Sequence, residues 1–162
     1  MQPARASEQS AAIQRPGLLR RLAAIFYDSL ILLALLILAT FPLMLFTHGR
    51  PIPAGTRAYT FYLLVVAWLF FAGFWTHGGQ TVGMRSWRLR LATVDGEPVG
   101  WMRATLRFAA AILSWAAFGL GFLWQWLDPD GLCWHDRLSG TTLQFLPRQP
   151  RRAGPEPGSG PG

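Results

Sequence analysis

The sequence predicts an all-α membrane protein, a small helical bundle with two clear transmembrane helices and a third membrane segment. Three observations predict this class. Apolar residues make up 51% of the 162 residues, and charged residues only 14%. Residues 30–46 form a run without any charge, and two further apolar runs follow at 59–75 and 104–127. Each is close to the roughly 20 residues that a helix needs to cross the hydrocarbon core.

The first helix is expected to begin near Leu18 and to continue to about Phe46. Pro42 either kinks this helix or marks the end at which it leaves the membrane. Asp28 lies close to the start of the apolar run, a position where a carboxylate is unusual. If the span begins at Leu22, Asp28 lies about 10 Å inside the membrane, whereas a span from Ser29 leaves it at the interface.

The second helix is predicted over Tyr59–Trp75, with aromatic residues toward both ends as is typical of membrane helices. The stretch before it, 48–57, contains two prolines and two glycines and reads as a loop. Gly78 and Gly79 end the helix, and the glycine-rich stretch 78–83 is a tight turn without the lysine of a phosphate-binding loop.

The third membrane segment, residues 104–127, is either a single crossing or a re-entrant hairpin. Its only charge is Arg107, and Gly119 and Gly121 lie past its centre, where they can break it. We favour the hairpin, because it keeps the arginine-rich C-terminal tail on the same side as the other arginine clusters.

A short cytoplasmic β-pair is predicted beside the helices. Residues 87–91 alternate between apolar side chains and arginine and are followed by an Asp95-Gly96 turn signal. Residues 141–146 supply a second strand of alternating character. We expect these two strands to pair.

Composition and charge divide the chain into three parts: a disordered N-terminus (1–17), a membrane domain (18–146) and a disordered Pro, Gly and Arg tail (147–162). All fifteen basic residues are arginines, for a net charge of +7. Their position beside apolar runs predicts a cytoplasmic N-terminus in the cell inner membrane and contact with anionic lipid headgroups, not with nucleic acid. Because three short segments enclose little volume, we also expect a homo-oligomer or a membrane partner protein.

The charged residues beside the membrane segments are the candidate site. Arg21 and Asp28 lie seven residues apart, so on a helix they share one face, about 10 Å apart along the axis, with Ala24 between them. Asp28 is then hydrated at the interface, part of a structural ion network, or an ion or proton site. Arg103 and Arg107 form one basic edge that pairs with Asp28, with Asp136 or with lipid phosphate.

No enzymatic activity, metal or cofactor is expected. Cys133 is the single cysteine, and the run Cys133-Trp134-His135-Asp136 has no accompanying oxyanion-hole motif. The three histidines lack metal-ligand spacing. The stretch 128–131, Asp-Pro-Asp-Gly, lacks the further acids of a calcium loop and is expected to be a turn.

Three motifs, in order along the chain, resemble those of the RDD family of small membrane proteins. They are RLAAIFYD at 21–28, GQTVGMR at 79–85 and HDRLSGT at 135–141. The resemblance covers residues 18–146 and implies that Arg21, Asp28 and Asp136 act as a set. The family often has a lysine where this chain has Met84, so Arg85 would supply the cation there.

The resemblance also implies a function. Transport has been proposed for the family, and sodium/proton exchange is attributed to some members. We therefore expect transport of monovalent cations or protons. The alternative is a scaffold or accessory subunit, without transport, that binds a partner protein or anionic lipid.

Overall fold

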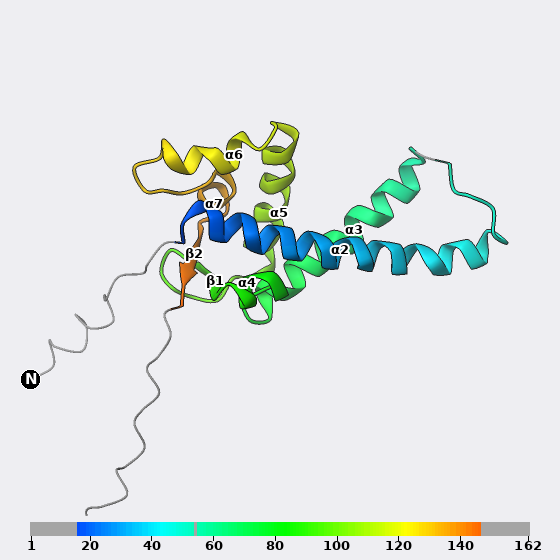
Figure 1. Ribbon diagram of the computed structural model, residues 1–162, viewed down its shortest axis with the longest axis horizontal. Helices are drawn as coiled ribbons and strands as arrows, with labels where there is room; N and C mark the ends of the chain where they lie inside the picture. Colours follow the sequence, from blue (N-terminus) through cyan, green and yellow to red (C-terminus); the bar gives the residue numbers. More distant parts are fainter. Residues whose placement is uncertain (1–15, 54, 147–162) are drawn as a thin grey trace, which may run out of the picture.

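A computed structural model describes residues 16–53 and 55–146 (Figure 1). The predicted disordered tail, and the predicted disordered N-terminus apart from Pro16 and Gly17, lie outside these ranges. In chain order the elements are α2 (Leu18–Phe46), α3 (Arg57–Thr76), α4 (Val82–Ser86), β1 (Leu89–Thr93), α5 (Trp101–Ala116), α6 (Leu120–Leu123), the 3-10 helix η1 (Trp124–Trp126), α7 (Trp134–Ser139) and β2 (Thr141–Phe145).

Helices α2 and α3 are each long and apolar enough to cross a membrane, which confirms the two predicted spans. In the most apolar 18-residue stretch of α2, 0% of the residues are buried inside the protein. In the corresponding stretch of α3, 11% are buried. Surfaces this apolar need lipid around them. Pro42 lies inside α2 and does not end it.

The predicted third membrane segment is broken, as expected, next to Gly119. Helix α5 and the α6–η1 pair are bent by 108° relative to each other. Phe118 (φ 53°) and Gly119 (φ 79°) both adopt the left-handed backbone conformation at the break, which interrupts a right-handed helix. A broken span and a re-entrant loop both have this shape, so the side of the C-terminus stays a prediction.

The predicted β-pair is confirmed. Strands β1 and β2 are antiparallel, with Leu91 opposite Leu143. Strand β1 begins at Leu89, two residues later than predicted, because Arg88 has a φ of 55° and is not extended. Both leucines of the central pair belong to the hydrophobic core.

The molecule has a crowded end and an extended end (Figure 1). The long helix α2 runs the length of the domain. The short elements α4, α7, β1 and β2 gather around its N-terminal half, and its C-terminal half extends away with α3. The only buried residues of α2 are Arg21, Ala24 and Asp28, all in the N-terminal half. The two short helices α4 and α7 were not predicted, and they supply the partners of these polar residues.

Candidate functional site

Four of the five buried Asp and Arg side chains in the described residues make up the candidate site; the fifth, Asp128, pairs with Arg137. Arg21 and Asp28 on α2 are each 4% exposed, Arg107 on α5 is 5% exposed and Asp136 on α7 is 1% exposed. Removing a charge from water is costly unless a partner compensates it. The partners of these four side chains therefore decide what the site can do.

Asp136 is held by two guanidinium groups. Its Oδ2 accepts a hydrogen bond from Arg21 Nη1 at 2.7 Å, and its Oδ1 accepts one from Arg107 Nη1 at 2.5 Å. The backbone N–H of Cys133 also donates to Oδ2, at 3.2 Å. Arg107 Nη1 donates in addition to Thr141 Oγ1, at 2.7 Å. We call this group, Arg21, Arg107, Asp136 and Thr141, the Asp136 clamp, because it ties α2, α5, α7 and β2 together.

The clamp keeps Asp136 ionised. Burial by itself would raise the pKa of this carboxyl, but the charges of Arg107 and Arg21 outweigh burial and hold its pKa well below the usual value of 3.8. A carboxylate that pairs with two cationic side chains and becomes protonated only in strong acid is a poor proton carrier at neutral pH.

Asp28 has neutral partners instead. Thr81 Oγ1 donates to its Oδ2 at 2.5 Å, and the Gly83 backbone N–H donates to its Oδ1 at 2.8 Å. Across residues 16–53 and 55–146, Asp28 makes no ion pair. The predicted common face of Arg21 and Asp28 is present, with Ala24 buried between them, but Arg21 binds Asp136 and not Asp28.

The sequence around α4 explains how Asp28 is held. Thr81 is the N-cap of α4 and its hydroxyl also accepts the Met84 N–H, which fixes the side chain. A Cβ at Gly83 would lie 2.9 Å from Asp28 Oδ1, so only glycine allows this close approach. Sequence reasoning treated 78–83 as a turn and missed both donors. The threonine before a short apolar stretch was the available signal for a helix cap.

The supporting arginines divide into two groups. Arg107 pairs with Asp136, one of the alternatives left open by its position in the sequence. Arg103 is exposed and donates to the Gly140 carbonyl at 3.4 Å. Arg85 is exposed as well. Neither Arg85 nor Arg103 has an ion-pair partner in the described part of the chain.

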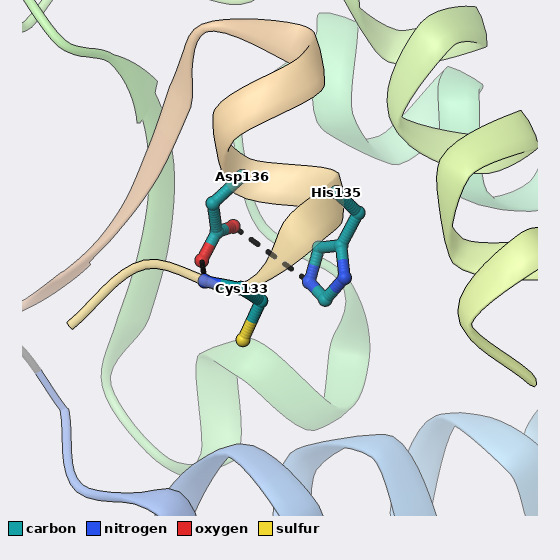
Figure 2. A group of neighbouring side chains, drawn as sticks. All are labelled: Cys133, His135 and Asp136. Carbon is teal, nitrogen blue, oxygen red and sulfur yellow. Dashed lines mark hydrogen bonds and ion pairs between the residues drawn. The ribbon is translucent and has the colours of Figure 1, made fainter. Parts of the chain in front are cut away.

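Cys133, His135 and Asp136 form a compact group whose potential ligand atoms all lie within 4.8 Å of one another (Figure 2). Burial, followed by the neighbouring Asp136 charge, raises the pKa of the Cys133 thiol to about 11. Burial, followed by the charge of Arg107, lowers the pKa of His135 to about 3. Both groups are therefore neutral at pH 7, and the thiol is not an activated nucleophile.

The same group is poorly suited to a divalent cation. Both oxygens of Asp136 already bind arginines, and Arg21 Nη1 lies 3.2 Å from Cys133 Sγ. A metal ion here would bring two further positive charges next to two guanidinium groups. The arrangement instead fits a support for the clamp, in which the Cys133 sulfur is an acceptor for Arg21.

A cavity of about 180 Å³ lies between the polar residues. Its polar lining comes from Arg21, Asp28, Thr81, Arg107 and His135. Most of the remaining wall is apolar, and its aromatic members are Phe71, Trp75, Phe108, Trp115 and Phe122. Asp28 and Arg21 thus face one common space from two levels of the same helix.

The fold and the site define a small polytopic α-helical membrane protein with a buried charge cluster. The sequence profile of the RDD family matches residues 15–140, more than three quarters of the chain, and all three motifs fall almost entirely within it. The chain belongs to the RDD family, whose members are membrane proteins. Neither the curated proteins nor the solved structures that were compared with it include a match.

Proposed function

We propose that this protein carries a monovalent cation or a proton across the membrane, with Asp28 as the ion-binding group. The observation that carries the proposal is the pairing of Asp28. It is a buried carboxylate on a membrane-spanning helix, and its partners in the described residues are the neutral donors Thr81 and Gly83. An ionisable residue inside a membrane segment is by default a candidate for an ion path or a proton relay.

The charges of the site favour Asp28 over Asp136 as the ion-binding group. A cation at Asp136 would have to displace Arg21 or Arg107, which already neutralise it. Asp28 keeps an uncompensated negative charge when it is ionised, and each of its oxygens accepts one hydrogen bond while retaining a lone pair. Carboxylate and hydroxyl oxygens are hard ligands that suit such cations. Asp28 lines a cavity of about 180 Å³, which is large enough to hold an ion beside the carboxylate.

The proposal includes an orientation and an assembly. The N-terminus lies in the cytoplasm and the protein is in the cell inner membrane, in keeping with the arginines that precede α2. A homo-oligomer or a partner protein completes the ion path, since two spans and a bent third segment enclose little volume. Reporter fusions at Gly55, Glu97 and the C-terminus test this orientation.

The test is ion-dependent proton flux in vesicles that contain the full chain. Asp28→Asn is expected to lower sodium- or potassium-dependent flux by at least about tenfold, because the neutral amide has no negative charge to hold a cation and no proton that it can release. Asp95→Asn is the matched control, since Asp95 is exposed and follows β1. Unchanged flux in Asp28→Asn at equal protein levels would reject the proposal.

A second candidate function is a scaffold without transport, which binds a partner protein or anionic lipid. The Asp136 clamp favours it, because the clamp joins four elements and serves stability directly. If the protein is a scaffold, vesicles that contain the wild-type chain are expected to show no ion-coupled flux, and a fixed partner is expected to copurify with the chain. Neither candidate involves an enzymatic step.

A further inference from the structure

We propose that the cavity next to Arg21 binds the anionic head group of a membrane lipid, a carboxylate or a phosphate, with its acyl chain against the aromatic wall. This site is at the Arg21 end of the cavity that Asp28 also lines, and its binding group is Arg21, not Asp28. The first observation that supports it is the incomplete pairing of Arg21. Its Nη1 binds Asp136 and Cys133, but its Nε and Nη2 atoms are buried and have no hydrogen-bond partner in the described part of the chain.

The unpartnered nitrogens of Arg21 are a matched pair. Nε and Nη2 lie on one edge of the planar guanidinium and present two parallel N–H bonds, the geometry that binds both oxygens of a carboxylate or phosphate. Arg21 is only 4% exposed and lines the cavity. A buried charged donor without a partner is costly, so an oxyanion at this edge stabilises the site. His135 Nδ1, also buried and unpartnered, belongs to a residue that lines the same cavity.

The balance of charge also calls for an anion. Arg21 and Arg107 contribute two positive charges and Asp136 one negative charge, while His135 is neutral, which leaves one positive charge. Asp28 lies seven residues, or about 10 Å, further along α2, so an anion bound directly to Arg21 would compensate this charge more closely than Asp28 does. One bound monoanion would neutralise the Arg21 end of the cavity.

The wall of the cavity identifies the source of the anion as lipid. Phe71 lies on the candidate membrane span α3, and Phe108 and Trp115 lie on α5, the first half of the bent third segment, so the wall includes a helix that lipid surrounds. A soluble anion would leave this aromatic surface uncovered, whereas an acyl chain covers it. The volume of about 180 Å³ is only slightly larger than an apolar cavity of about 150 Å³ that holds benzene. It therefore fits a head group and its first few carbons, with the rest of the chain in the bilayer.

The experiment is photolabelling of the full chain in uncharged detergent micelles. The probes are a diazirine-bearing fatty acid, the corresponding alkyl phosphate and the methyl ester of the fatty acid, and mass spectrometry locates the labels. Both anionic probes are expected to label the aromatic wall, including Trp115 and Phe122. The ester is expected to label it at least about tenfold less, because it cannot form the charge-assisted hydrogen-bond pair with Arg21. An excess of inorganic phosphate is expected not to compete.

Two variants test the site itself. Arg21→Lys keeps a positive charge next to Asp136 but lacks the two-donor edge, and it should lower labelling by about tenfold or more. Ala111→Phe leaves all four residues of the Asp136 clamp unchanged and fills the cavity that Ala111 lines, so it should also abolish labelling. This variant is the test if Arg21→Lys does not fold. Arg20→Gln is the matched control, because Arg20 is exposed and its guanidinium lies over Phe145.

Several outcomes would overturn the proposal: equal labelling by the ester, unchanged labelling in Ala111→Phe, or unchanged labelling in a folded Arg21→Lys. Effective competition by inorganic phosphate would assign the site to a soluble anion and overturn the lipid as its source. Labelling needs no ion gradient, and Asp28→Asn should retain it. Failure of cation transport and failure of lipid binding are therefore distinguishable.

Discussion

Asp28 on α2 and Asp136 on α7 are two buried carboxylates, and they differ in the charge of their partners. Asp136 contacts two guanidinium groups, whereas Asp28 contacts a hydroxyl and a backbone N–H. Their exposed fractions, 1% and 4%, are nearly the same. Burial alone thus does not separate a structural acid from a candidate ion-binding acid. The presence or absence of a neighbouring positive charge does.

The largest expected effect is that of Asp136→Asn on stability. The substitution leaves Arg21 and Arg107 buried without a counter-charge, which is expected to cost about 3–5 kcal/mol in the free energy of unfolding. Thermal or denaturant unfolding in micelles measures it. Asp130→Asn is the control, because Asp130 forms an exposed pair with Arg137 worth less than about 1 kcal/mol. Equal losses in the two variants would show that no clamp exists.

Acidification is expected to destabilise the protein through His135. The pKa of this buried imidazole falls from 6.5 to about 3 on folding, so below pH 6.5 the unfolded chain binds a proton that the folded chain does not. Stability is therefore complete above pH 6.5 and is lost as the pH falls, by up to about 1.4 kcal/mol per pH unit. Asp136 stays ionised in this window, because its folded pKa lies below 3.8.

The variant His135→Phe isolates this effect. It retains a ring against Phe122, whose centroid lies 4.8 Å from that of His135, but it does not titrate. Melting temperatures at pH 7.5 and pH 5 should differ less in the variant than in the wild type. An identical pH dependence of the two proteins would mean that His135 is already charged or solvated in the folded state.

Gly83→Ala probes the close contact of α4 with α2. Its Cβ would lie 2.9 Å from Asp28 Oδ1 and still closer to the Ala24 carbonyl oxygen, so α4 must shift. We expect a loss of about 1–3 kcal/mol in the free energy of unfolding, as for an overpacked core. Gly78→Ala is the control, because a Cβ there meets nothing within 4 Å. Equal stability of the two variants would argue against the close approach of α4 to Asp28.

The smallest effect on stability is expected for Asp28→Asn, less than about 1.5 kcal/mol, because the amide has the same shape and can form one hydrogen bond with each partner, with the direction of the Thr81 bond reversed. Its oxygen accepts the Gly83 N–H, and its amino group donates to Thr81. Unfolding curves of this variant and of Asp136→Asn compare the two acids directly. A loss as large as that of Asp136→Asn would give Asp28 a structural role.

Much of this arrangement was predictable from local patterns. The two spans, the break at Gly119 and the β-pair follow from hydropathy, glycine position and alternation, which are properties of neighbouring residues. The common face of Arg21 and Asp28 follows from helix periodicity. The hydrogen-bond partners of Arg21 and Asp28 do not follow from helix periodicity. Arg21 lies 115 residues before Asp136, and no spacing rule connects α2 to a six-residue helix that sequence reasoning had not predicted.

The sharpest test of this division between the acids is carbodiimide modification of the full chain, with and without sodium or potassium. Carbodiimides attack protonated carboxyl groups in apolar surroundings, and mass spectrometry reports each acid separately. We expect Asp28 to be modified and to be protected by a monovalent cation, while Asp136, ionised between two arginines, is not modified. Modification of Asp136, or modification of Asp28 that no cation reduces, would contradict the account.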